Sequence, residues 1–280
     1  EVLILMEDTM FLKINHRTRY TYKNPIHSLT QCIKLFPSKH KGIKIINWNV
    51  TVKDAVMGAK VIESNGDQSL VSHVSKIKKS SIVNVKGEIK TIDTGGILEG
   101  YKESANPEIY LRNTKLTRPN NEIKEFVKMI EIKNKNKNKL SLAHLLKEEV
   151  HQHIEYSKGS TKIDTPATQS FKNKKGVCQD FAHLFISSSI CVGIPARYVV
   201  GYLESSNNND EATHAWAELY FKNVGWIAFD PTHNCCTNEK YVRICSGFDS
   251  LSAAPIRGVA IGSSEEKLNI KVSVDQVLQQ

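Results

Sequence analysis

The hydrophobic periodicity of the chain changes near residue 115, from the alternation of β-strands to the spacing of helices. In residues 11–22, apolar and aromatic side chains recur at every second position, which predicts a half-buried strand. Further strand-like segments lie at residues 43–52, 71–74 and 82–85, and Asn65-Gly66-Asp67 is a turn signal between them. Several short strands with little helix predict a small β domain over residues 1–115, sandwich-like or, as the alternative, barrel-like.

A second domain, of the α+β class, is predicted over residues 116–280. Apolar residues from Ile123 to Ile130 are spaced for one face of a helix, and a second run of this kind extends from Leu142 to Ile154. Strand-like segments follow these helices later in the chain, so both kinds of element are expected in this domain.

The composition is ordinary for a globular protein, with 40% hydrophobic and 24% charged residues among the 280. It excludes a collagen, a coiled coil and bulk disorder. No apolar run approaches the roughly 18–20 residues that cross a bilayer, so no contact with a membrane is expected. The five apolar residues near the N-terminus have no basic flank, and as they stand they do not form a signal peptide.

The six cysteines include no Cys-x-x-Cys pair. In a chain of this length without an export signal, they are expected to be reduced thiols rather than a disulfide framework. The sequence therefore predicts a cytoplasmic location.

The net charge of +9 raises the question of a nucleic-acid partner. The lysines are spread along the chain, however, and their densest run, from Lys133 to Lys139, alternates with asparagine and contains no aromatic residue. Stacking aromatics and a recognisable binding module are missing. This run is expected to be a solvated loop between two helices, and no nucleic-acid partner is expected.

One cysteine is predicted to lie at the start of a helix. Apolar residues at helical spacing follow Gly176 and stop before Gly193-Ile194-Pro195. Cys178 therefore falls in the first turn, where the helix dipole and unpaired N–H groups favour the nucleophilic thiolate. A small buried core cysteine is the alternative for this position. Cys191, at the far end of the helix, is expected in the core.

Two further strands, residues 213–221 and 226–230, are expected to form a hairpin. If it is centred near Lys222, His214 lies opposite Asp230, with Cβ atoms about 4.5–5.5 Å apart. A slip of one or two residues would still leave the two side chains neighbours. Taken singly, each has a structural explanation, as a strand histidine and as a turn residue before proline. Together with a cysteine at a helix start, they are the parts of a Cys–His–Asp triad.

Four segments of the chain resemble, in this order, the core of the transglutaminase-like family. A weaker resemblance, in His16-Arg-Thr-Arg-Tyr-Thr-Tyr22, is to the N-terminal β domain of bacterial transglutaminase-like proteins described as cysteine proteases. The four core segments are Gly-Val-Cys-Gln-Asp-Phe-Ala-His at 176–183, Gly-Ile-Pro-Ala-Arg-Tyr-Val-Val-Gly-Tyr at 193–202, His-Ala-Trp-Ala-Glu at 214–218 and Gly-Trp-Ile-Ala-Phe-Asp-Pro-Thr at 225–232.

The resemblance implies a papain-like fold, in which a helix carrying the cysteine packs on an antiparallel sheet carrying histidine and aspartate. It implies that Cys178 is the nucleophile, that His214 is the general base and later the acid, and that Asp230 orients the imidazole. The sequence departs from the family at His233, where asparagine is common, and at Ser246–Asp249, where Gly-Arg-Asp is usual. We expect neither departure to contact the triad.

The function predicted on this basis is a thiol-dependent amide or peptide hydrolase that acts on a peptide or protein through a thioester. A transglutaminase with an amine acceptor and a non-catalytic binding module are the alternatives. Trp216 and Tyr156 are expected to line the substrate cleft, although packing in the core explains Trp216 equally well. The sequence leaves the oligomeric state open.

A metal site is the remaining alternative, because His233, Cys235, Cys236 and Cys245 lie within 13 residues. Adjacent cysteines fit a single tetrahedral zinc ion poorly, and no acidic loop has the pattern of a calcium site. The sequence therefore predicts no metal and no cofactor. The three cysteines are expected to be reduced thiols, and the four residues are expected to lie in a loop and a strand.

Overall fold

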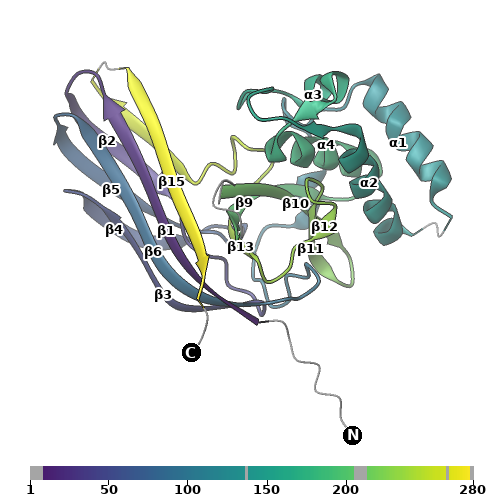
Figure 1. Cartoon of the computed structure of the whole chain (residues 1–280), viewed down its shortest axis with the longest axis horizontal. Helices are drawn as coiled ribbons and strands as arrows, with labels where there is room; N and C mark the ends of the chain where they lie inside the picture. Colours follow the sequence, from purple (N-terminus) through teal and green to yellow (C-terminus); the bar gives the residue numbers. More distant parts are fainter. Residues whose placement is uncertain (1–8, 136–137, 205–212, 263–264, 278–280) are drawn as a thin grey trace, which may run out of the picture.

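The protein consists of an all-β part and an α+β part that lie side by side (Figure 1). The computed structural model describes residues 9–135, 138–204, 213–262 and 265–277. Within these residues, no helix is long and apolar enough to cross a membrane.

The all-β part is a sandwich of two four-stranded antiparallel sheets, as the sequence predicted. One sheet has the order β15 (Glu266–Gln276), β1 (Thr9–Tyr22), β6 (Ser80–Ile92) and β3 (Ile43–Val52). The other has the order β14 (Ile256–Ile261), β2 (Ile26–Ile33), β5 (Gln68–Ile77) and β4 (Val56–Ile62).

Alternation along the strands explains how this sandwich closes. On β1, Leu12 and Ile14 are buried while their neighbours Lys13 and Arg17 are exposed, which is the pattern of a sheet with one solvated face. The buried side chains of the two sheets meet in one hydrophobic cluster.

The predicted division of the chain at residue 116 is wrong at the C-terminal end. β15 pairs along β1 and β14 pairs along β2, so residues 256–276 complete the two sheets of the sandwich. Figure 1 shows this return, with the yellow β15 beside the purple β1. Sequence spacing alone could not reveal it, because pairing between strands more than 200 residues apart leaves no local signal.

The α+β part is built on a five-stranded antiparallel sheet. Its order is β12 (Cys235–Cys236), β11 (Gly225–Asp230), β10 (Thr213–Phe221), β9 (Ala196–Leu203) and β13 (Tyr241–Gly247). The other elements are the short helix η1 (Pro107–Leu111), α1 (Asn121–Lys133), α2 (Lys139–His153), β7 (Glu155–Tyr156), α3 (Ala167–Asn173), β8 (Lys175–Gly176) and α4 (Cys178–Cys191).

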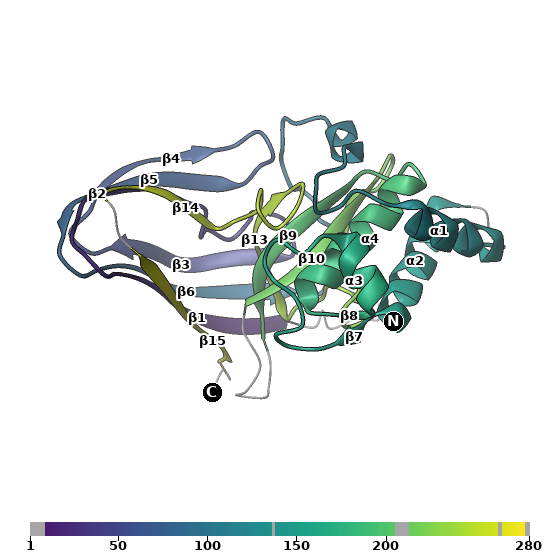
Figure 2. The same ribbon diagram turned by 90° about the horizontal axis from the view of Figure 1, so that it is seen from above.

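The helices cover one face of this sheet and the sandwich covers the other (Figure 2). On the helical side, Phe181, Leu184 and Phe185 of α4 pack with Ala217 and Leu219 of β10. On the other side, Tyr202, Val242 and Ile244 belong to the hydrophobic cluster of the sandwich. A sheet covered on both faces is buried along its length, and β10 accordingly has six consecutive buried residues from His214 to Leu219.

Buried charges also join the two parts of the chain. Glu218 of β10 accepts from Arg197 Nε at 2.6 Å and from Arg243 Nε at 2.7 Å, and all three residues are buried. Arg243 Nη1 donates to Asp67 Oδ1 of the sandwich at 2.9 Å. Arg197 Nη1 donates to Glu103 Oε2 at 2.6 Å. Each buried guanidinium therefore contacts two carboxylates, Glu218 and one other, at the interface between the sandwich and the sheet that carries His214.

Candidate active site

Cys178 is the first residue of α4, in agreement with its predicted place in the first turn. Val177 before it is extended, and its N–H donates to Asp180 Oδ2 at 2.8 Å, which fixes where the helix begins. Thr161 Oγ1 donates to the same carboxylate oxygen at 2.6 Å. The N–H of Cys178 is one of the four at a helix start that have no partner within the helix. It is therefore available to a ligand beside the sulfur.

His214 Nε2 lies 2.7 Å from Asp230 Oδ2. The predicted register of the hairpin is wrong by two residues, however, because the β10–β11 ladder pairs Ala217 with Phe229. The connecting loop is closed by a hydrogen bond from Val224 N to Phe221 O, and Gly225 follows in the left-handed region with φ +94°. In this register, Asp230 is the diagonal neighbour of His214 on the same face, within reach of two extended side chains.

The Asp230 carboxylate accepts five hydrogen bonds. Oδ1 accepts from the backbone N–H of Thr232 at 2.8 Å and of His233 at 3.3 Å. Oδ2 accepts from Tyr241 at 2.8 Å, in addition to the two imidazoles of His214 and His233, both at 2.7 Å. Burial alone would raise the pKa of Asp230, but the charge of His214 and these hydrogen bonds outweigh it and lower the pKa. The carboxylate is therefore held as an anion.

Both Asp230 and Cys178 act on the imidazole of His214 and raise its pKa. Because an ionised carboxylate can only accept, Nε2 donates to Asp230, and Nδ1 is the nitrogen left for the contact with Cys178. Burial alone would lower the pKa of His214. The charge of Asp230, its hydrogen bond and the contact with Cys178 outweigh burial and raise the pKa to about 10. A protonated imidazole beside a thiol is the environment in which a thiolate forms.

His233 was expected to stand apart from the predicted triad, and that expectation is wrong. Its Nδ1 lies 2.7 Å from Asp230 Oδ2, and its ring centroid lies 5.0 Å from that of His214. One local signal for this contact is the spacing, since a residue three positions after an aspartate can fold back on it. Tyr241, the other additional partner, had no local signal, because it comes from β13.

The four residues of the alternative metal site do not converge. His233 contacts Asp230, Cys235 contacts the Tyr241 hydroxyl, and the buried Cys245 donates to Ala253 O at 3.1 Å. Cys191, expected in the core, is exposed instead, because α4 ends at the rim of the helical layer.

Another trio, His214, Asp230 and His233, has donor atoms within 4.8 Å of one another. Both ring nitrogens already lie at hydrogen-bond distance from the one oxygen, Asp230 Oδ2. The oxygen occupies the point where the two nitrogens converge, so this is the geometry of a shared acceptor rather than of an open metal site.

Trp216 and Tyr156, the two predicted substrate contacts, differ in exposure. Trp216 is 1% exposed, stacks on His214 with ring centroids 6.3 Å apart and packs edge-on against Tyr241. Its indole therefore packs against the imidazole and Tyr241 and has almost no exposed surface for a substrate. Tyr156 is 47% exposed and pairs with Gly176, two residues before Cys178, in the parallel β7–β8 ladder. The backbone of Tyr156 therefore lies close to the start of α4.

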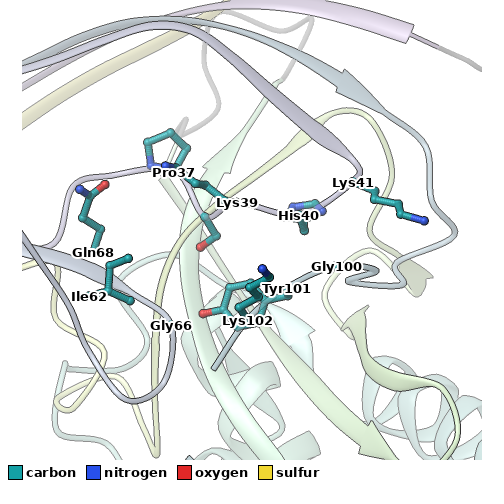
Figure 3. Close-up of a pocket in the computed structure, with 11 residues that line it drawn as sticks. Pro37, Lys39, His40, Lys41, Ile62, Gly66, Gln68, Gly100, Tyr101 and Lys102 are labelled. Atoms are coloured by element: carbon teal, nitrogen blue, oxygen red, sulfur yellow. The ribbon is translucent and has the colours of Figure 1, made fainter. Parts of the chain in front are cut away.

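A hollow of about 480 Å³ lies away from these residues, between the sandwich and the segment that follows Gly100 (Figure 3). Lys39, Lys41 and Lys102 stand around it, with Tyr101 in its wall. None of Cys178, His214 and Asp230 lines this hollow.

Comparison with known proteins agrees with this architecture. Residues 129–231 match the transglutaminase-like superfamily, and residues 12–86 match the bacterial transglutaminase-like N-terminal region. The first match contains Cys178 and both partners, and the second lies in the sandwich. Residues 129–231 therefore resemble a transglutaminase-like core, and residues 12–86 resemble the N-terminal region of bacterial transglutaminase-like proteins.

Curated relatives include an uncharacterized protein of Mycobacterium tuberculosis, 34% identical over 139 residues, which are 46% of this chain and 44% of that protein. One of Mycobacterium leprae is 30% identical over 130 residues, or 44% of this chain and 46% of that protein. The matched part is thus less than half the length of these relatives. A crystal structure from Cytophaga hutchinsonii, named as a proposed cysteine protease, has a TM-score of 0.74 at 21% identity and covers 98% of this chain and 92% of that one. This likeness establishes the fold.

Proposed function

We propose that the protein is a cysteine peptidase or amidase in which Cys178, His214 and Asp230 act as a catalytic triad. One observation carries the proposal, namely the hydrogen bond between His214 Nε2 and the buried Asp230, with Cys178 at a helix start among the groups that raise the pKa of His214. A nucleophile, a base in contact with it and a group that orients the base are the parts that covalent acyl transfer requires. The match of residues 129–231 to a superfamily of enzymes supports the same catalytic role.

The first half-reaction acylates the thiol. The Cys178 thiolate attacks the carbonyl carbon of an amide, and the N–H of Cys178 donates to the oxyanion that forms. Protonated His214 gives its proton to the amide nitrogen as the C–N bond breaks. The products of this step are a thioester on Cys178 and a free amine, and His214 is left neutral.

The second half-reaction removes the acyl group. Neutral His214 takes a proton from water as the oxygen attacks the thioester carbonyl, and the C–S bond breaks to give a carboxylic acid and the thiolate. An amine in place of water would give a new amide, which is the transglutaminase reaction. We favour water, because superfamily resemblance in the sequence is to bacterial proteins described as cysteine proteases.

The substrate we infer is a peptide or protein, bound past the exposed ring of Tyr156. Trp216 is assigned to packing behind His214 rather than to direct contact, since its indole is 1% exposed. The inferred chemistry needs a reduced thiol, and a cytoplasmic location remains the prediction that suits it.

Mass spectrometry of products from a peptide library, with and without added primary amines, tests this proposal. Hydrolysed peptides in the wild type and none with Cys178→Ala are expected. A product in which the added amine has replaced the leaving amine would identify a transferase. Equal turnover by Cys178→Ala would contradict the triad. Cys191→Ala, which removes an exposed cysteine at the other end of α4, is the matched control and should keep full activity.

A further inference from the structure

We propose that His233 is a positioning residue of this site, a role that rests on the proposed function. It holds the Asp230 carboxylate in the orientation that His214 requires. His233 Nδ1 lies 2.7 Å from Asp230 Oδ2, and it must donate, because the ionised carboxylate only accepts. The same oxygen accepts from His214 Nε2 at 2.7 Å. One oxygen of Asp230 therefore accepts a hydrogen bond from each imidazole.

His233 contacts both oxygens of the carboxylate. Its ring binds Oδ2, and its backbone N–H donates to Oδ1 at 3.3 Å. Rotation of the carboxylate about its Cβ–Cγ bond would break the contact with the ring. The Tyr241 hydroxyl, 2.8 Å from Oδ2, opposes the same rotation from β13. His233 and Tyr241 together leave Oδ2 one orientation, in which it faces His214.

His233 also lies between Asp230 and solvent. Asp230 is fully buried, whereas the side chain of His233 is 51% exposed. Removal of this ring would admit water to the carboxylate, and water would screen the attraction between Asp230 and His214. Three other ionisable groups of the described residues lie near this turn. Cys235 contacts the Tyr241 hydroxyl, Lys147 donates to Asn234 O at 2.8 Å, and His151 Nδ1 lies 3.1 Å from Pro231 O.

The experiment compares two substitutions of His233, one that removes the hydrogen-bond donor and one that keeps a donor. His233→Phe keeps a ring of similar size and removes the donor, whereas His233→Asn keeps a donor. The rate of iodoacetamide alkylation is measured at the Cys178 peptide by mass spectrometry between pH 5 and 9. The exposed Cys191 of the same molecule is the internal reference. Far-UV circular dichroism establishes that each variant is folded.

We expect His233→Phe to slow alkylation of Cys178 by about tenfold at pH 7, the scale of one hydrogen bond to a charged group. The acid limb of its rate profile should move to higher pH, and His233→Asn should recover most of the rate. If His233 had only a structural role, the pH profile of Cys178 alkylation would not shift in a folded variant. If His233→Phe does not fold, His233→Leu makes the same comparison with His233→Asn.

The inference is overturned if the variant without a donor alkylates at the wild-type rate and with the wild-type profile. If alkylation of Cys178 is slow in His214→Ala but unchanged in His233→Phe, the role of His233 is rejected and the triad stands. Equal rates in the wild type and in His214→Ala would instead reject the proposed function itself.

Discussion

Asp230 Oδ2 lies 2.7 Å from His214 Nε2, although the two residues are not opposite each other in the β10–β11 ladder. Their contact runs diagonally across the strands, over a Cα separation of about 7–8 Å that only long or well-aimed side chains cross. The Asp230 carboxylate is aimed by its other four hydrogen bonds. The geometry of the pair therefore depends on the turn after Asp230 as much as on the sheet.

Asp230→Asn should change the titration of His214. Without the carboxylate charge, burial dominates, and the pKa of His214 should fall from about 10 to its ordinary value or below. Proton NMR of the imidazole, assigned by its absence in His214→Gln, measures this shift directly. Turnover should fall by about 10²-fold or more, the usual contribution of acid–base catalysis. An imidazole that stays protonated at pH 8 in the variant would contradict the assignment.

Glu218→Gln should destabilise the fold without touching the triad. The substitution removes the carboxylate shared by the buried Arg197 and Arg243, but each keeps one other anion, so the cost should lie near the lower end of the about 3–5 kcal/mol of a broken buried pair. Urea unfolding measures the change in the free energy of unfolding. Glu265→Gln is the matched control, because its pair with Lys23 is exposed and worth about 1 kcal/mol or less. Equal losses in the two variants would show that the buried network is not a source of stability.

The protein should lose stability in mild acid. Burial lowers the pKa values of His16, His40 and His183 to about 4. Between pH 6.5 and 4, the unfolded chain binds protons that the folded chain does not, so the free energy of unfolding falls as the pH falls. His183 shows the reason, since its Nε2 accepts from Ser250 N at 3.1 Å and a protonated ring could not accept.

Urea unfolding at pH 7 and pH 5 measures this loss. His183→Gln should reduce it, whereas His27→Gln, at an exposed position, should leave it unchanged. The raised pKa of His214 has the opposite effect on stability. Its contribution to the free energy of unfolding is complete below pH 6.5 and declines as the pH rises toward about 10. A free energy of unfolding that is constant from pH 5 to 7 would contradict the burial of neutral histidines.

Removal of residues 256–280 should disrupt the sandwich, because it strips a strand from each sheet. The loss of β15 and β14 exposes the edges of β1 and β2, which are then open to pairing between molecules. Size-exclusion chromatography and urea unfolding should show aggregation and a lower midpoint. A chain ending at Val277 keeps both strands and is the control. A shortened chain that does not aggregate and has an unchanged midpoint would show that the sandwich does not depend on β14 and β15.

Local patterns were sufficient to predict the sandwich class and the start of α4. The alternation of β1 and the helical spacing after Cys178 depend only on neighbouring residues, and both are confirmed. The diagonal contact of His214 with Asp230 fell within the tolerance of the predicted register, although the register itself was wrong. Its error came from the turn, where one residue of loop length moves every pair in the ladder.

Contacts between distant segments could not be predicted in this way. β14 is exposed at five of its six positions and has no alternation that would assign it to a sheet. The contact of Tyr241 with Asp230 depends on how β13 pairs with β9, and that pairing is set by the whole fold. The role of His233 likewise required the shape of the turn after Asp230, which composition does not define.

The most direct test of the central claim is the rate of Cys178 alkylation as a function of pH, in the wild type and in His214→Ala. Because the pKa of His214 is raised to about 10, its positive charge should keep Cys178 reactive from pH 5 to 9 in the wild type. In His214→Ala, the rate should fall at neutral pH to that of the exposed Cys191 and rise only toward alkaline pH. Identical profiles for the two proteins would contradict an activated thiol at Cys178.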